Sequence, residues 1–107
     1  MRIGLALVSI LAASAGNAEV VAVEQRGEVD LRTFVCESVP RSAIRRVCFD
    51  ETNNYVLIQL GTTYRHYCGI DSQTIYALLH AEHPSKYFVS EIRGRFDCRR
   101  GNVPPYN

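Results

Sequence analysis

Tyrosine, arginine, histidine and cysteine side chains follow one another in the run Tyr-Arg-His-Tyr-Cys that ends at Cys68. A histidine exchanges a proton near neutral pH and a tyrosine hydroxyl can assist it. Tyr64 with His66 could therefore act as an acid–base pair in a hydrolase such as a nuclease. Successive side chains of a β-strand point to opposite faces. Tyr64, His66 and Cys68 are therefore expected on one face of a strand, and Arg65 and Tyr67 on the other.

This alternation separates the run into two groups. No second catalytic histidine, carboxylate pair or activated serine can be placed beside either group from the sequence. Aromatic and polar side chains that pair across neighbouring strands are typical of a half-exposed sheet. The sequence therefore favours a protein without catalytic activity, in which Tyr64 and His66 are candidate binding residues. A secreted hydrolase that uses these two residues is the alternative.

Zinc binding is the second chemistry that the sequence offers. Cysteine thiolates together with His66 could bind the metal, and so could the pair His80 and His83 near the end of a predicted helix. The four cysteines contain no Cys-x-x-Cys pair of the kind found in zinc sites. We therefore expect neither a metal site nor a cofactor.

Basic residues concentrate near the carboxyl end, where residues 86–100 hold five basic side chains against two acidic ones. Guanidinium groups bind phosphates and carboxylates through paired hydrogen bonds. Tyr87, Arg93 and Arg95 are therefore candidate binding residues for an acidic ligand or a protein partner. The whole chain has a formal net charge of only +1, which argues against a strongly electrostatic binder of nucleic acid. A mildly basic, solvated surface is the alternative.

The first 18 residues have the composition of a secretory signal peptide. A positive start is followed by an apolar run over 3–11 and then by small residues, as in segments that signal peptidase removes. The apolar run is about half the roughly 20 residues that a membrane-spanning helix needs. We expect cleavage after Ala18, or after Ala15, and export to the periplasm or the cell exterior. No membrane span is expected after cleavage.

Four cysteines follow this segment, at positions 36, 48, 68 and 98. An even number in a small exported chain is typical of disulfides, each of which adds about 2–4 kcal/mol to stability. Three pairings are possible. In a three-stranded meander, Cys48 and Cys68 would lie on the outer strands, roughly 9–10 Å apart. That exceeds the ~4.4–6.8 Å Cα separation of a disulfide, so we favour Cys36–Cys48 with Cys68–Cys98.

Three strands and two helices are predicted to position these residues. Alternating apolar residues predict strands over 42–50, 55–60 and 63–70, joined by short turns as in an antiparallel meander. The apolar period then becomes that of a helix over 72–83, and a second helix starts at Pro84. The expected fold is α+β, a small three-stranded antiparallel meander followed by two helices on one face (β-β-β-α-α) and stapled by disulfides.

The length of the chain leaves room for one domain. We expect that domain over 42–98. An N-terminal extension over 19–41 is expected to pack on it, and an irregular tail is expected over 99–107.

The segments SAIRRVCFD, IYALLHAE and KYFVSEIRGRF together resemble the KTSC domain over residues 42–96. The residues that match its opening and closing patterns are Ser42, Ile44, Val47, Phe49, Asp50, Ala81, Tyr87, Phe88, Ile92 and Arg93. Where the family has a central Tyr-x-Tyr, this sequence has tyrosine at 64 and histidine at 66. With its four cysteines, the sequence looks like a stand-alone, exported, disulfide-bonded branch of that family.

The resemblance implies no established activity, and RNA binding is the function suggested for the family. Together with the predicted export, it leads us to expect an exported KTSC-like protein that acts as a non-catalytic binding module. The secreted hydrolase described above is one alternative. An RNA-binding module, implied by the resemblance alone, is the other.

Overall fold

The computed structural model describes residues 19–98 and 103–106. The predicted signal peptide lies outside the described residues, and so does most of the predicted tail. The elements are β1 (Val20–Val23), β2 (Gly27–Asp30), β3 (Val35–Ser38), β4 (Ile44–Asp50), η1 (Glu51–Asn53), β5 (Tyr55–Leu60), β6 (Thr63–Cys68), α2 (Ser72–Leu79), α3 (Pro84–Tyr87) and η2 (Phe88–Ile92). None of the described helices is long and apolar enough to cross a membrane.

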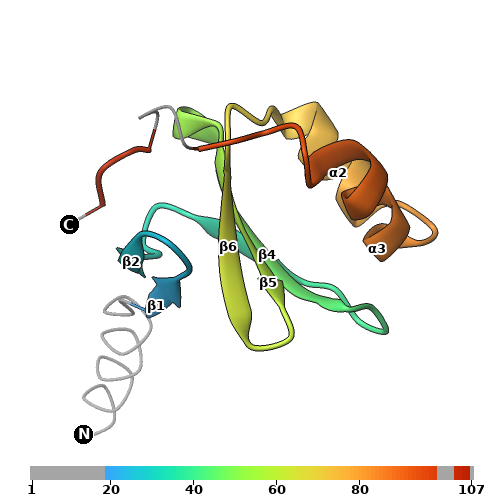
Figure 1. Ribbon diagram of the computed structural model, residues 1–107, viewed down its shortest axis with the longest axis horizontal. Coiled ribbons are helices and arrows are strands. Elements are labelled where there is room, and N and C mark those ends of the chain that lie inside the picture. The colour runs from blue at the N-terminus through green and yellow to red at the C-terminus, as the bar shows by residue number, and fades with distance from the viewer. Residues whose placement is uncertain (1–18, 99–102, 107) are drawn as a thin grey trace, which may run out of the picture.

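The described strands form one six-stranded mixed sheet with the order β2-β1-β6-β5-β4-β3. Neighbouring strands are antiparallel, except that β1 runs parallel to β6 and pairs with it at Val23 and Tyr64. Figure 1 shows the short β1–β2 hairpin set at an angle to the long strands β4, β5 and β6. The sheet therefore curls and has a concave face.

The predicted three-stranded meander is wrong as a description of this sheet. Strands β4, β5 and β6 do form a meander, but residues 20–38, predicted as part of an extension, supply three further strands. Each of these has only four residues, so each offers too few alternating side chains for the pattern to reveal a strand. Their pairing with strands elsewhere in the chain, and not local pattern, makes them part of the sheet.

Strand β5 lies in the middle of the meander and is buried on both faces. Tyr55, Val56, Leu57 and Ile58 each have 0% exposed surface. Tyr55 and Leu57 belong to the apolar cluster on the concave face, and Val56 and Ile58 to the cluster under the helices. A continuous run of apolar and aromatic residues is what a strand covered on both sides requires.

Three short helical segments cover the convex face of the sheet (Figure 1). The side chain of Asp71 caps α2 by accepting a hydrogen bond from the Thr74 amide at 2.9 Å. This helix ends at Leu79, earlier than the predicted 83. After Pro84, the second predicted helix divides into α3 and a π-helical turn, η2.

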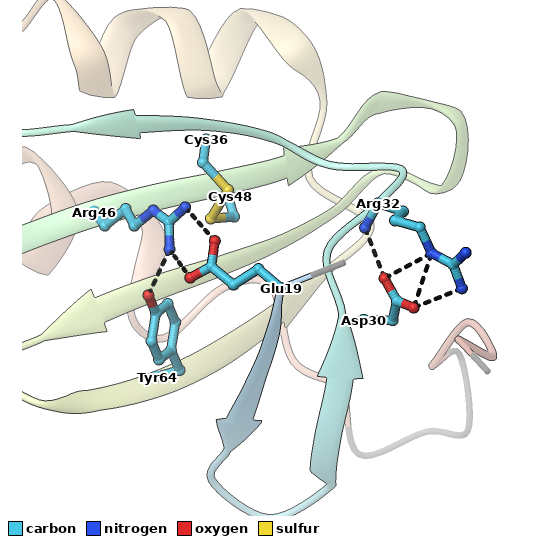
Figure 2. The surroundings of a disulfide bond; sticks show 7 residues. All are labelled: Glu19, Asp30, Arg32, Cys36, Arg46, Cys48 and Tyr64. Carbon is cyan, nitrogen blue, oxygen red and sulfur yellow. Dashed lines mark hydrogen bonds and ion pairs between the residues drawn. A yellow bond between two sulfur atoms is a disulfide. The ribbon is translucent and has the colours of Figure 1, made fainter. Parts of the chain in front are cut away.

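Two disulfides join the described strands to each other and to the C-terminal segment. Cys36 on β3 is bonded to Cys48 directly opposite it on β4, with a Cα separation of 4.0 Å. Cys68 at the end of β6 is bonded to Cys98 beyond η2, with a Cα separation of 5.0 Å. This is the pairing that the sequence favoured. Figure 2 shows the Cys36–Cys48 bond beside an ion pair on the same part of the sheet.

Candidate functional site: a basic cavity beside strand β6

The side chains of β6 alternate between the two faces of the sheet as predicted. Tyr64 and Cys68 belong to the concave-face cluster, and His66 reaches Tyr55 of that same cluster. Tyr67 lies on the other face, where its ring meets that of Phe88 edge-on at 5.6 Å. The run of reactive residues is therefore divided between two environments.

Tyr64 is held in a polar network at the beginning of β6. Its hydroxyl accepts a hydrogen bond from the Arg46 guanidinium at 3.1 Å, and that guanidinium also forms an ion pair with Glu19 at 2.7 Å (Figure 2). Hydrogen bonds to Glu19 and Tyr64 raise the pKa of Arg46 above its ordinary value. Tyr64 and His66 share a face but no hydrogen-bonding partner. Among the described residues, the hydrogen bonds of Tyr64 and His66 thus lead to different partners, Arg46 and Tyr55.

His66 is linked to Arg26 through the hydroxyl of Tyr55. The guanidinium of Arg26 donates to the Tyr55 oxygen at 3.0 Å, and the same oxygen lies 2.8 Å from Nδ1 of His66. Because arginine can only donate, the tyrosine oxygen accepts from Arg26, and its own proton is available to Nδ1 of His66. In the tautomer of neutral His66 that carries its proton on Nε2, this hydroxyl donates to Nδ1 and the chain of hydrogen bonds from Arg26 is complete.

The pKa of His66 is lowered from its ordinary value. Burial is the main cause, and the positive charge of Arg26 adds to it, while Asp97 acts in the opposite direction. His66 is therefore neutral at neutral pH and can offer the Nε2 proton to an acceptor.

Arg26 and Tyr55 belong to an aromatic group that also ties down the C-terminal segment. The guanidinium lies 5.6 Å from the centre of the Tyr55 ring and 5.5 Å from that of Tyr106. The Tyr106 hydroxyl donates to the buried carboxylate of Asp50 at 2.5 Å, and the Asn53 amide donates to the same carboxylate at 2.8 Å. Burial, and next the hydrogen bond to Asp50, raise the pKa of Tyr106.

A cavity of about 440 Å³ opens beside this group. Its lining comes from the turn after β1 (Gln25, Arg26), from β6 (His66, Tyr67), from residues 93–98 and from Val103. Three arginines line it against one aspartate, Asp97. Arg95 has a long ion pair of 3.8 Å to Glu91, and Arg93 forms no ion pair within the described part of the chain. The cavity therefore has a surplus of positive charge.

The segment that carries Arg93 and Arg95 is fixed at both ends. The amide of Arg93 donates to the carbonyl of Phe88 at 2.9 Å, which closes the π-helical turn over the buried Ile92. At the other end, the Cys68 amide donates to the carbonyl of Phe96 at 3.1 Å, and residue 98 is bonded to the sheet by its disulfide. Both arginines therefore have a supported backbone although their side chains are exposed.

Three of the five candidate binding residues come together in this cavity: His66, Arg93 and Arg95. Tyr64 lies in the Arg46 network, and Tyr87 packs at the edge of the cluster under the helices. Arg26 was missed because the hairpin that presents it was not predicted. The available signal was Gly27, which follows the apolar run of β1 and has a φ of 99° in the structure, a conformation that favours glycine.

The residues considered for zinc do not form a metal site in the described part of the chain. All four cysteines are in disulfides, so they offer no thiolate. No group of three or more histidine, cysteine, aspartate or glutamate side chains that could hold a metal occurs among the described residues. His80 is engaged locally, because its ring stacks on Tyr76 at 3.8 Å and its Nδ1 lies 2.9 Å from the Tyr76 carbonyl oxygen.

Fold and site together define a small α+β domain with two disulfides and a basic cavity on one side of a curled sheet. The family model of the KTSC domain matches residues 41–96, which is more than half of the chain. The chain belongs to the KTSC domain family. No curated protein matches the sequence.

Proposed function

We propose that this KTSC domain protein is an exported, non-catalytic binding module whose basic cavity holds a ligand with a phosphate or carboxylate group. The observation that carries the proposal is the convergence of Arg26, Arg93 and Arg95 on one cavity against a single carboxylate. Its volume of about 440 Å³ lies within the range of small-molecule sites. An acidic segment of a protein could present the same group.

The chemistry of the lining residues supports an oxyanion. Two exposed guanidinium groups can each donate two parallel hydrogen bonds to it. Neutral His66 would add the proton on Nε2, because its Nδ1 is already paired with Tyr55. Arg26 contributes charge from the inner side, where its donation to Tyr55 and its position over two rings hold it.

A catalytic role has less support than binding. His66 is placed to donate, but its other nitrogen is engaged by Tyr55, and no described carboxylate pair stands beside it. Tyr64, the partner that a nuclease-like mechanism would require, is bound to Arg46. RNA binding would use the same arginines to hold phosphates, so the binding experiment includes an RNA probe.

We expect inorganic pyrophosphate or a hexaglutamate peptide to bind wild-type protein, with heat released in a calorimetric titration. Replacing Arg93 and Arg95 together with glutamine should weaken binding by at least about 100-fold, since each lost charge-assisted hydrogen bond is worth about 1.5–3 kcal/mol. A short uridine oligonucleotide serves as the RNA probe. Stronger binding of this probe, weakening steeply with salt, would assign the cavity to RNA.

The matched control is Arg45→Gln, which removes an exposed arginine of β4 that does not line the cavity. It should leave the affinity of every probe unchanged. Equal losses in Arg45→Gln and in the double variant would contradict the proposal. So would the absence of binding by all three probes. If the wild-type protein cleaved the oligonucleotide and His66→Gln did not, the protein would be an enzyme and the proposal of a non-catalytic module would be wrong.

Export is tested separately from binding. When the full chain is expressed in a bacterial host, we expect a periplasmic protein whose first residue is Glu19, with no free thiols. Leu7→Arg interrupts the apolar run of the leader and should leave an uncleaved chain inside the cell. N-terminal sequencing and thiol titration of the two cell fractions give the answer. A full-length wild-type chain in the cytoplasm would refute export and leave the cavity proposal intact.

A further inference from the structure

Strand β3 forms one edge of the described sheet, and its only strand partner among the described residues is β4. A groove of about 350 Å³ lies between this strand and α2, on the face of the sheet opposite to the concave one. Val35 projects from β3 at the rim of the groove with 68% of its surface exposed. An apolar side chain thus stands beside an unpaired strand edge.

The backbone of β3 is oriented to accept a further strand. Cys36 and Cys48 face each other with a Cα separation of 4.0 Å, which is the short spacing of a pair without mutual backbone hydrogen bonds. The amide and carbonyl of Cys36 therefore point away from β4, toward the free edge. The disulfide holds this edge in place. Of the features that protect an edge, the strand lacks lysine, proline and a bulge; it is short and carries one charged side chain, Glu37, which lines the groove.

The groove combines an apolar floor with acidic side chains. Val47, Phe49 and Ile75 form part of the floor, and Glu37 and Glu51 lie among the lining residues. No lysine or arginine lines the groove. The negative charge of the groove is thus complementary to a basic side chain of a partner. Its apolar floor is complementary to an apolar side chain of the same partner.

We propose that β3 binds an extended segment of a partner protein as an additional antiparallel strand, with the sequence pattern basic-x-apolar. The middle residue exchanges backbone hydrogen bonds with Cys36. Because side chains alternate along a strand, the residues before and after it both point into the groove. In antiparallel register the basic side chain then faces Glu37 and the apolar one faces Val35.

A second copy of this chain is a poorer occupant. Symmetric antiparallel pairing about Cys36 would set Val35 of one copy against Glu37 of the other, so each carboxylate would face an apolar side chain. A basic residue of a partner protein opposite Glu37 forms an ion pair that is absent when two copies of the chain pair. This surface is independent of the proposed anion site, since no residue lines both.

The test uses the peptide acetyl-Thr-Thr-Lys-Thr-Val-Thr-Thr-amide and the full chain labelled with ¹⁵N. We expect the amide signals of β3 and of the groove to shift on titration. Glu37→Lys, at an exposed position, should weaken binding by at least about fivefold through loss of attraction and gain of repulsion. Glu28→Lys is the matched control, an equal charge change on the exposed opposite edge strand, and should leave the affinity unchanged.

A second peptide separates strand pairing from simple charge attraction. Methylation of the backbone nitrogen of its central threonine removes the hydrogen bond to Cys36, so binding should fall by at least about fivefold, as for loss of one net hydrogen bond. Equal binding of both peptides would overturn the proposal, as would equal effects of the two glutamate variants. Absence of shifts at millimolar peptide would overturn it too. A concentration-dependent dimer with β3 at its interface would assign the edge to a second copy.

Discussion

Replacing Cys68 and Cys98 together with alanine is expected to lower the free energy of unfolding by about 3–4 kcal/mol and to abolish anion binding. The bond closes a loop with a sequence separation of 30 residues, and a cross-link of this length restricts the unfolded chain by roughly that amount of free energy. It also anchors the segment that carries Arg93 and Arg95. Urea denaturation gives the stability, and calorimetry with pyrophosphate gives the affinity.

The second disulfide provides the control. Replacing Cys36 and Cys48 with alanine opens a shorter loop, of separation 12, and should cost about 3 kcal/mol. Because this bond lies on β3 and β4, anion binding should survive in the folded variant, while binding of the strand peptide should weaken. A variant without the Cys68–Cys98 bond that binds pyrophosphate as tightly as wild type would show that this bond does not support the cavity.

Tyr55→Ala is expected to destabilise the protein by about 3–5 kcal/mol. Tyr55 is the largest side chain that is fully buried, and removing an aromatic ring from a packed core leaves a cavity. The change also deprives Arg26 and His66 of the hydroxyl that joins them. Urea denaturation measures the loss, which should be among the largest of any single substitution in the sheet.

Tyr55→Phe isolates the hydroxyl from the ring. It should cost only about 0.5–1.5 kcal/mol, the usual worth of a hydrogen bond. The pKa of His66 should stay below its ordinary value, because burial and the charge of Arg26, which lower it, both remain. Nitrogen NMR of the imidazole as a function of pH reports both the pKa and the tautomer. A proton on Nδ1 of neutral His66 in the wild-type protein would contradict the proton arrangement described above.

The sequence predicted the part of the fold that local pattern controls. Strands β4, β5 and β6 are joined by short turns and have long alternating or continuous apolar runs, so their existence and order could be foreseen. The distance across that meander also excluded a Cys48–Cys68 bond, and of the two pairings that remained, the favoured one is the one found. The place of β1, β2 and β3 in the sheet escaped prediction because these strands are short and because β1 pairs with a strand about forty residues later, at Val23 and Tyr64.

The candidate site was likewise predicted only in part. His66 was recognised from its type, and Arg93 and Arg95 from their spacing in a basic region. Arg26 comes from the hairpin that was not predicted. Tyr55 was predicted to lie on a strand, but the hydrogen bonds of its hydroxyl to Arg26 and His66 were not predicted. Tyr64 accepts a hydrogen bond from Arg46, which also contacts Glu19, and this second contact requires the residue before β1 to lie near β4. Sequence spacing could not supply that proximity.

The parallel bridge between β1 and β6 also bears on how the cavity forms. The meander connects residues close in the chain, so it has low contact order and is expected to form early. The β1–β2 hairpin pairs with the rest of the sheet at one register position, supported by the Glu24 amide on the Tyr64 carbonyl at 2.8 Å. Arg26 lies in the turn of that hairpin, so the basic cavity is completed only when the hairpin docks. The hairpin is thus expected to open as a local unit, which hydrogen exchange can follow, and the proposed ligand is expected to lower the population of the open state.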